Sequence, residues 1–430
     1  SDLRHHRQAR SRALDGKVLR GSRGSRYVEF DGLGIETRQL YEIPPVPGRN
    51  LKLTIDLELQ AAATAALEEG LAFANEDRYL KDQANPPAEP HEYKAGAGAV
   101  VVLDVRNGDV LALASYPLYD NQLFVEGIST RKYLEYTEDE NSPLVNKAAA
   151  DHFPPGSTLK IFMAMAAQHE NMLSVDSQFT CTSGIWVPYT WDESRGDRYL
   201  CWQKTDGGHG TLNMIEALER SCDVYFYNVG TPEQKPEHAQ MNLHYRDLNY
   251  DTGEKGDLHF FQGLGIQKIH DNLYDRFWFG QPTGIELPFE AEGLVPDPAW
   301  KDEVYGEGWS AGDTINTSIG QGFFLATPLQ MAVNTAAIAN GGFYLLAGLF
   351  GTSITGVLNA ARATRPLPAM APLIASAEPS TLSNRSRSSR ASSTTADADW
   401  VEARSSTSSG PVSARSVDTS ARNAFRVSST

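Results

Sequence analysis

The sequence predicts a mixed α/β fold that combines antiparallel strands with helices. The clearest indication is a pair of apolar stretches, residues 100–105 and 110–114, on either side of Asn107-Gly108. An Asn-Gly pair between two such stretches favours the tight turn of a β-hairpin, because both residues tolerate the positive φ angles that this turn requires. The second indication is a series of helix start and stop signals before and after the hairpin. We therefore expect an antiparallel sheet accompanied by helices.

Helices are marked by the residues at their ends. Asp56 has a carboxylate that can accept hydrogen bonds from the free N–H groups of a first helical turn. Thr327-Pro328 combines a capping hydroxyl with a proline, whose missing N–H is no loss at the first helical position. The expected elements are strands at residues 26–30 and 51–55, helices at 57–75, from 157, at 212–219, from 221 and at 327–340, and irregular chain after the 221 helix up to about 315.

The bulk composition limits the classes of function. The chain has 430 residues, enough for two or three domains, and 41% apolar residues can form a sizeable core. A net charge of −16 argues against a nucleic-acid partner. No run of 18 or more apolar residues occurs in the sequence, so we expect a chain that is soluble or that has been separated from a membrane anchor.

Three regions of the chain differ in composition. Residues 1–48 are charged and end in a proline-rich linker, so we expect the remnant of an N-terminal domain. Residues 49–343 are expected to form the main domain. Of the 87 residues in 344–430, 18 are Ser, and we expect those beyond about 359 to be disordered. A shifted reading frame or a misjoined gene explains this tail better than a natural linker does.

Ser157 is a candidate nucleophile. The preceding Pro154-Pro155-Gly156 starts a helix, so Ser157 lies in the first turn, where free N–H groups and the positive end of the helix dipole favour a developing anion. Lys160 is one turn further on the same face, and a buried amine there can lose its proton and act as a base. The alternative is a serine that only caps a surface helix.

A second Ser-x-x-Lys sequence, Ser129 to Lys132, shows how little the pattern alone decides. Average usage of Ser and Lys gives about one or two chance matches in a chain of this length. Ser129 follows Gly127-Ile128 instead of a Pro-Pro-Gly sequence, and no apolar helix comes after it. We therefore expect chemistry at Ser157 only.

Ser221-Cys222-Asp223 is the second candidate element, 64 residues after Ser157. A serine at a helix start that points into the same cleft can relay a proton between Lys160 and a leaving group. The alternative for Ser221 is an ordinary N-cap residue.

All three cysteines of the chain, Cys181, Cys201 and Cys222, lie in one short region together with His209. Three thiolates and one imidazole are a common tetrahedral ligand set for zinc. We therefore expect these four residues to hold a structural zinc ion. The alternative is three buried free thiols and a surface histidine.

Together these elements resemble the penicillin-binding proteins, and specifically the elongation-type class B transpeptidases, the group of penicillin-binding protein 2. Ser-x-x-Lys followed by a second Ser motif is typical of this group of serine acyltransferases. The resemblance covers about residues 43–343. Its further landmarks are IPPVPGRNLKLTID at 43–56, GAVVVLD at 98–104, ASYP at 114–117, FGQPTGIELP at 279–288 and GDTINTSIGQG at 312–322.

The resemblance implies a peptidoglycan D,D-transpeptidase with an antiparallel sheet that has helices on both faces. Ser157 would be acylated by the penultimate D-Ala of a peptidoglycan stem peptide, and the acyl group would pass to an amine of a neighbouring strand; β-lactams mimic the donor. Lys160 would be the base, Ser221 the proton relay and the Ser157 N–H half of the oxyanion hole. Asp223 replaces a commoner Asn, which we expect to be tolerated.

The resemblance also implies a setting. The full-length protein would have a membrane anchor, a non-catalytic N-terminal domain and a periplasmic catalytic domain, and its partner would be a membrane glycan polymerase of the elongation complex. Some family members hold zinc through carboxylates at or near the positions of Cys181 and Cys201, so the ligand set of this chain differs there.

The third family element, a Lys-Thr-Gly on a strand that lines the cleft, is absent because no lysine follows Lys301. The C-terminal strands of the sheet, the site for the substrate carboxylate and the second oxyanion donor would be missing with it. Two functions follow. The chain is a transpeptidase impaired by an altered C-terminal sequence, or it is a non-catalytic β-lactam-binding remnant or scaffold of the wall-synthesis complex.

Overall fold

The computed structural model describes most of the chain up to Phe350. The described residues are 21–48, 50–84, 95–189, 191–232, 244–350 and 365–366. The expected disorder of the C-terminal tail concerns residues that lie outside this description, apart from the short segment at 365–366. Residues 1–20 of the N-terminal region also lie outside it.

The hairpin expected around Asn107-Gly108 is confirmed. Strands β3 (Gly98–Leu103) and β4 (Val110–Tyr116) pair antiparallel along their length. Gly108 has a φ of 78°, so the turn uses the left-handed conformation that glycine adopts at no steric cost.

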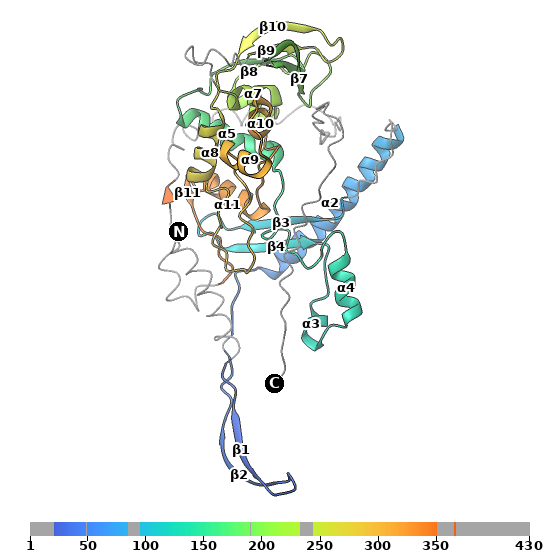
Figure 1. The fold of residues 1–430 in the computed structure, drawn as a ribbon, viewed down its shortest axis with the longest axis vertical. Coiled ribbons are helices and arrows are strands. Elements are labelled where there is room, and N and C mark those ends of the chain that lie inside the picture. Colours follow the sequence, from blue (N-terminus) through green and yellow to red (C-terminus); the bar gives the residue numbers. More distant parts are fainter. Residues whose placement is uncertain are drawn as a thin grey trace, which may run out of the picture. The chain divides into compact units, whose positions relative to one another are not determined.

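Successive side chains of a strand point to opposite sides, so the hairpin has two faces. Helices cover both of them. On one face α2 (Leu57–Ala84) packs closely, with Ala63 against two buried alanines of β4. On the other face Val101 and Leu103 pack against the main core, to which α11 (Pro328–Ala339) contributes. The predicted antiparallel sheet with helices on both faces is therefore confirmed (Figure 1).

Two of the predicted helix starts have the expected caps. Asp56 Oδ1 accepts hydrogen bonds from the backbone N–H groups of Glu58 and Leu59, both at 3.0 Å. At α11, Thr327 Oγ1 accepts from Gln330 N at 3.0 Å, and the Gln330 side chain accepts from Thr327 N at 2.9 Å. This reciprocal capping box satisfies two N–H groups that the helix itself leaves open.

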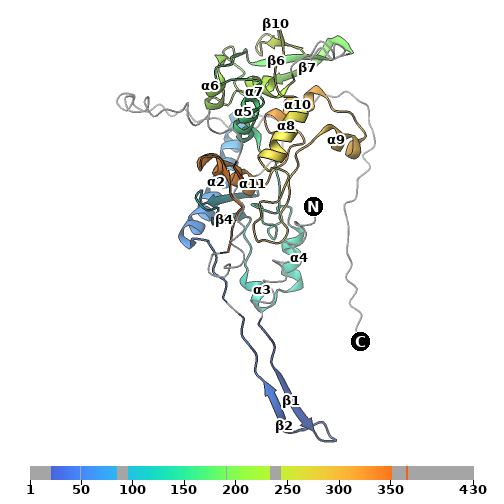
Figure 2. The ribbon, with the colours of Figure 1, turned by 90° about the vertical axis from the view of Figure 1, so that its left-hand side faces the viewer.

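The main core is built largely from helices, and the first of these, α5, directly follows a short 3₁₀ turn. Helix α7 packs against α5 and α10, and the three lie together in both ribbon views (Figures 1 and 2). The remaining helical elements are α3 (Gln122–Glu126), α4 (Thr130–Glu138), the 3₁₀ turn η1 (Gly156–Leu159), α5 (Lys160–His169), α6 (Met214–Glu219), α7 (Asp223–Gly230), α8 (Ile266–Asp271), the π turn η3 (Asn272–Arg276), α9 (Pro298–Tyr305) and α10 (Ala311–Ser318).

Two further sheets position candidate metal ligands, which lie at or next to the ends of their strands. A four-stranded antiparallel sheet has the order β10-β9-β6-β7, and β5 pairs with β8. Cys181 is the last residue of β5, and Cys201 directly follows β7. The bounds are β5 (Phe179–Cys181), β6 (Gly184–Tyr189), β7 (Asp192–Leu200), β8 (Gly210–Leu212), β9 (His244–Leu248) and β10 (Lys255–Phe260).

Two expectations were wrong. The stretch up to residue 315 is not irregular, since it contains β9, β10 and helices α8 to α10. The signals of α9 are present in the sequence: Asp297 caps its first turn, and Gly306 ends it with a φ of 67°. The strand expected at 51–55 is a single bridge, because neighbouring backbone N–H groups bond to different segments: Thr54 N to Leu349 O and Asp56 N to Leu111 O.

The chain continues to pack after Phe343, where its composition changes. Tyr344, Ala347 and Leu349 are buried in the main core, and Val110 N donates a hydrogen bond to Gly348 O at 2.8 Å. A two-residue strand, β11 (Phe343–Tyr344), pairs with β12 (Arg365–Pro366). None of the helices in the described part of the chain is long and apolar enough to cross a membrane.

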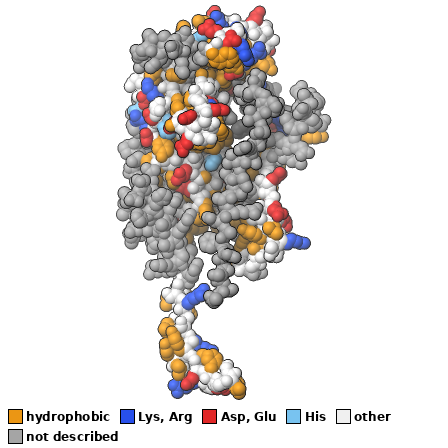
Figure 3. Space-filling view, in the orientation of Figure 1, with side chains coloured by type: hydrophobic (Ala, Val, Ile, Leu, Met, Phe, Trp, Pro, Cys, Tyr) orange, Lys and Arg blue, Asp and Glu red, His pale blue; other side chains and the backbone are white. Residues whose placement is uncertain are grey.

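A separate hairpin near the N-terminus confirms the strand expected at 26–30. Strands β1 (Ser25–Phe30) and β2 (Glu36–Ile43) pair antiparallel, and the rings of Tyr27 and Tyr41 stack at 4.2 Å. Hydrophobic side chains are exposed along this hairpin (Figure 3). They are Tyr27, Phe30, Leu33, Ile35, Leu40, Tyr41 and Ile43.

Candidate active site and metal cluster

Ser157 lies in the single 3₁₀ turn η1, which leads directly into α5. The turn begins at Pro155 without a side-chain cap, so the Ser157 hydroxyl does not cap the helix. Gly156 has a φ of 58°, which glycine adopts without strain. The Pro-Pro-Gly sequence therefore starts the helical segment as expected, and Ser157 is exposed.

Helix α5 carries Lys160 into the core. Seven of the ten residues of α5 are buried, among them Phe162, whose ring packs edge-on against Phe277 and Phe279. Lys160 itself is only 1% exposed. A lysine is rarely buried to this extent unless its amine is paired. The partners of Lys160 therefore decide what it can do.

The Lys160 amine finds its partners 61 and 63 positions further along the chain. It donates hydrogen bonds to Ser221 O at 2.7 Å and to Ser221 Oγ at 3.2 Å, and it lies 2.5 Å from Asp223 Oδ1. The structure thus brings together three of the four residues that the sequence singled out as catalytic. Among the described residues, no hydrogen bond joins the fourth, Ser157, to this amine.

Ser221 occupies the tight turn between α6 and α7. Its φ is 50°, a value that residues with a side chain adopt rarely and that is often found at functional sites. Cys222, rather than Ser221, is the N-cap residue of α7. The Ser221 hydroxyl therefore does not cap the helix and instead meets the Lys160 amine.

Asp223 is held from two sides. Its Oδ1 pairs with Lys160, and its Oδ2 accepts a hydrogen bond from Trp202 N at 3.1 Å. The Trp202 indole also donates to Arg220 O at 3.0 Å, so this tryptophan holds the Ser221 turn. Burial raises the pKa of Asp223, and the nearby Lys160 ammonium opposes that shift. Sequence reasoning missed Trp202, although its place next to Cys201 was a signal.

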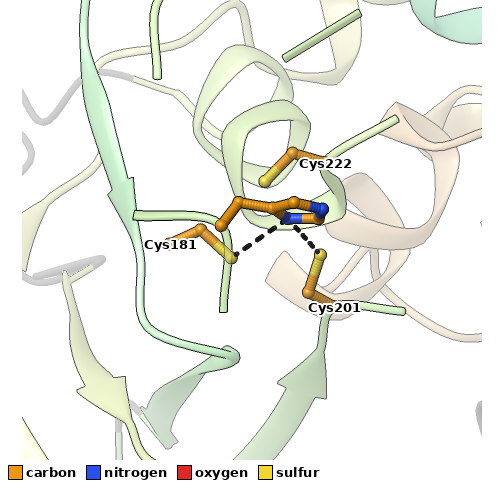
Figure 4. A group of neighbouring side chains, drawn as sticks. Cys181, Cys201 and Cys222 are labelled. Carbon is orange, nitrogen blue, oxygen red and sulfur yellow. Dashed lines mark hydrogen bonds between the residues drawn. The ribbon is translucent and has the colours of Figure 1, made fainter. Parts of the chain in front are cut away.

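The structure brings Cys181, Cys201, His209 and Cys222 together, and Figure 4 shows the side chains of the three cysteines converging. Their ligand atoms all lie within 4.8 Å of one another. They come from the end of β5, the residue after β7, the loop before β8 and the N-cap of α7. All three thiols are buried. The arrangement could hold a metal ion.

The distances in this cluster fit a tetrahedral site. His209 Nδ1 lies 3.4 Å from Cys201 Sγ and 3.7 Å from Cys181 Sγ. Bond lengths of about 2.3 Å for Zn–S and about 2.0 Å for Zn–N give an S···N edge of about 3.6 Å. The buried His209 Nε2 has no hydrogen-bond partner in the described structure, so within it only the thiols of the cluster hydrogen-bond to the ring.

The thiols of the cluster ionise unequally. Hydrogen bonds with Cys201 and Cys222 lower the pKa of Cys181 to about 3. The reciprocal hydrogen bonds, together with burial, raise the pKa of Cys222. Metal binding requires deprotonated thiols, so a cation at the centre would release the proton that Cys222 retains.

The second Ser-x-x-Lys sequence has different surroundings. Ser129 is the N-cap of α4, and its Oγ accepts a hydrogen bond from Lys132 N at 3.3 Å. The Lys132 amine pairs with Glu135 on the same exposed helix at 2.5 Å. No residue of α4 is buried. The prediction that Ser129 lies outside any buried catalytic arrangement agrees with this geometry.

Comparison with known proteins identifies the class. The family of the penicillin binding protein transpeptidase domain matches residues 98–366. The chain therefore belongs to this transpeptidase family. Within it, the chain is similar to the peptidoglycan D,D-transpeptidase MrdA of Salmonella typhimurium, with 34% identity over 324 residues. That alignment covers 75% of this chain and 42% of the relative, so the chain spans less than half of the relative's length.

Solved structures agree. The complex between penicillin-binding protein 2 and MreC from Helicobacter pylori has a TM-score of 0.56 at 26% identity, covering 83% of this chain and 52% of that one. A peptidoglycan synthase complex, solved to explain how polymerization and crosslinking are coordinated, gives 0.58 at 31% identity, covering 79% and 50%. The predicted relationship to penicillin-binding protein 2 is confirmed.

Proposed function

We propose that this chain is the catalytic part of a peptidoglycan D,D-transpeptidase of cell elongation, acting through an acyl-enzyme on Ser157 and open to β-lactams as donor mimics. The observation that carries the proposal concerns Lys160, which lies one helical turn after Ser157. Its amine is buried and hydrogen-bonded to Ser221 and Asp223. A buried, paired lysine next to an exposed serine is a functional arrangement rather than a surface one.

Each residue has one role in the proposed reaction. In the proposed step the Lys160 amine takes the proton of the Ser157 hydroxyl as its oxygen attacks the carbonyl carbon of the penultimate D-Ala. Ser221 passes that proton to the nitrogen of the departing D-Ala, and the C–N bond breaks. Asp223 and the backbone of the Ser221 turn orient the amine. An acceptor amine then attacks the ester, its proton passes through Lys160 to the Ser157 oxygen, and the C–O bond breaks to free Ser157.

The proposal includes a limit on rate. The sequence offers no Lys-Thr-Gly after Lys301, and loss of one oxyanion donor typically costs on the order of 100- to 1000-fold in rate. We expect this chain to acylate slowly, and a variant with a family-like C-terminal sequence after Phe343 to acylate fast.

The test is to incubate both chains with a labelled penicillin and to measure intact mass. A mass increase on the restored chain that Ser157→Ala abolishes, while Ser129→Ala retains it, supports the acyl-enzyme. Rapid stoichiometric labelling of the unaltered chain at Ser157 would contradict only the expected impairment and would leave the proposed acyl-enzyme intact. No adduct on either chain would contradict the transpeptidase proposal.

We also propose that Cys181, Cys201, His209 through Nδ1, and Cys222 hold one structural zinc ion. Three thiolates and an imidazole suit zinc better than harder cations, and the ion would tie four chain segments together. Because Cys222 lies between Ser221 and Asp223, the same ion would fix the turn that faces Lys160. Carboxylates are not needed to complete the set.

Elemental analysis of protein purified without chelator tests the zinc proposal. We expect about one equivalent of zinc, and a strong chelator should lower the melting temperature as the ligands lose their common partner. Cys201→Ala should abolish both the zinc content and the chelator effect, whereas a substitution of the exposed His152 should not. Less than about a tenth of an equivalent in the parent protein would refute the proposal.

The setting proposed for the full-length protein is a periplasmic catalytic domain with a membrane anchor. Its proposed partner is a membrane glycan polymerase of the elongation complex. Two similarities support this: the relative named MrdA is a peptidoglycan D,D-transpeptidase, and one similar structure is a synthase complex that couples polymerization to crosslinking. Co-purification of the full-length protein with its polymerase from membranes is the measurement that tests it.

A further inference from the structure

The turn that follows α10 lies against the turn that carries Ser157. Gly320 N donates to Thr317 O at 3.0 Å, and Gln321 N donates to Asn316 O at 3.0 Å, so the end of α10 fixes its path. Gly320 and Gly322 have φ angles of 75° and 70°. Residues 319–322 therefore form a compact turn whose conformation depends on glycine on both sides of Gln321.

The contact between the two turns is made by backbone atoms. Gly156 N donates a hydrogen bond to Gly320 O at 2.9 Å. A Cβ on Gly320 would lie 2.2 Å from Gly156 O, so any side chain there would push the Ser157 turn away. Two hydrogen bonds between Phe153 and Ala326, both at 3.0 Å, hold the segment before Gly156 as well.

The Gln321 side chain is the polar group that this contact places next to Ser157. Its amide nitrogen would lie 3.5 Å from a Cβ built on Gly156, the residue immediately before Ser157. Gln321 is half-buried, and within the described part of the chain its side-chain amide has no hydrogen-bond partner. The amide therefore lies near the nucleophile with its donors and its acceptor available to a ligand.

We propose that Gln321 contacts the acyl donor, with its side-chain amide hydrogen-bonded to the peptide backbone of the donor next to Ser157. This inference rests on the proposed function. A peptide donor has backbone C=O and N–H groups on both sides of the scissile bond, and an amide side chain can pair with either kind. The glycine-flanked turn fixes the backbone position from which this amide reaches the donor.

Binding of a peptide that ends in D-Ala-D-Ala tests this contact without requiring acylation. The Kd is measured for the Ser157→Ala chain and for the same chain with Gln321→Ala added. Loss of one neutral hydrogen bond should raise the Kd about fivefold. Gln321→Glu keeps an acceptor but loses the N–H donors, and its charge opposes the donor carboxylate, so it should raise the Kd further.

A matched control separates contact from structure. Gln267 is an exposed glutamine on α8 that hydrogen-bonds to Asp271, and Gln267→Ala should leave the Kd unchanged. The melting temperature should be the same for Gln321→Ala and its parent, because the substitution removes no hydrogen bond within the described structure.

An unchanged Kd for Gln321→Ala, no binding to the Ser157→Ala parent, or a fall in melting temperature that accounts for the effect would overturn the inference. None of these results touches the proposed function if penicillin still forms an adduct at Ser157. No adduct on the restored chain, by contrast, overturns the proposed function itself.

Discussion

Two Ser-x-x-Lys sequences in this chain fold into opposite environments. Ser129 caps an exposed helix, and its lysine pairs with a glutamate of the same helix. Ser157 caps nothing, and its lysine is buried and bonded to residues more than 60 positions away. The residue types and the spacing are identical in the two cases. The difference therefore comes from what precedes and follows the motif.

The apolar character of α5 explains the difference. Lys160 is drawn into the core because the residues after it are apolar, as in Ile161-Phe162-Met163. Removing their surface from water outweighs the cost of burying an amine that finds good partners. Helix α4 has no buried residue, so nothing draws Lys132 inward. A motif of this kind becomes a site only when the adjacent helix has a buried face.

The largest difference in acylation rate and stability is expected between substitutions of the two lysines. Lys160→Met removes the proposed base and leaves Asp223 without its partner, so acylation of the restored chain should fall about 100- to 10,000-fold. Unfolding free energy should fall by about 3 kcal/mol, the lower end for breaking a buried pair. Lys132→Met should change neither quantity measurably. Equal effects of the two substitutions in penicillin labelling and urea titrations would remove the distinction.

A smaller effect on stability is expected at the backbone contact between Gly320 and Gly156, in the turn that carries Ser157. Gly320→Ala should cost about 2 kcal/mol, because its Cβ would overlap Gly156 O. Gly306 has nearly the same φ but open space around it, so Gly306→Ala should cost only about 1 kcal/mol. Urea titration gives both values. Similar costs for the two glycines would mean that the Ser157 turn can shift freely.

The smallest expected effect separates the two serines by stability alone. Ser129→Ala removes a helix cap and should cost about 1 kcal/mol, or less if α4 frays locally. Ser157→Ala removes no cap and should stay within about 0.5 kcal/mol of the parent protein. Hydrogen exchange at the first turn of α4 reads the first change directly. A greater loss for Ser157→Ala would show that its hydroxyl has a structural role.

The sequence predicted those parts of the fold whose signals are local. The Asn107-Gly108 turn, the Asp56 cap and the Thr327 cap each depend on a few neighbouring residues, and all three are present. The convergence of three cysteines and a histidine was also predicted, because all four lie within residues 181–222 and together form a common zinc ligand set.

Helix α9 was missed although its capping signals are local, but other missed parts depend on contacts between distant segments. The strand expected at 51–55 alternates correctly, but its backbone is shared between β4 and residues 348–350, so no continuous ladder forms. The contact of Gly320 with Gly156 has no local signal beyond two glycines around Gln321. The hairpin of β9 and β10, by contrast, has a local turn signal in Asn249 and Gly253 that was overlooked.

The placement of the cysteines has one more consequence, for experiment. The chain has three cysteines, and all three are buried in the cluster that holds the Ser221 turn. A thiol reagent therefore finds no sulfur on the surface of the native protein, and it can react only when this region opens. Its reaction rate then measures the frequency of that local opening, which is otherwise hidden beneath the global stability. A single cysteine introduced at an exposed position would in turn react alone and accept a probe without any other change to the chain.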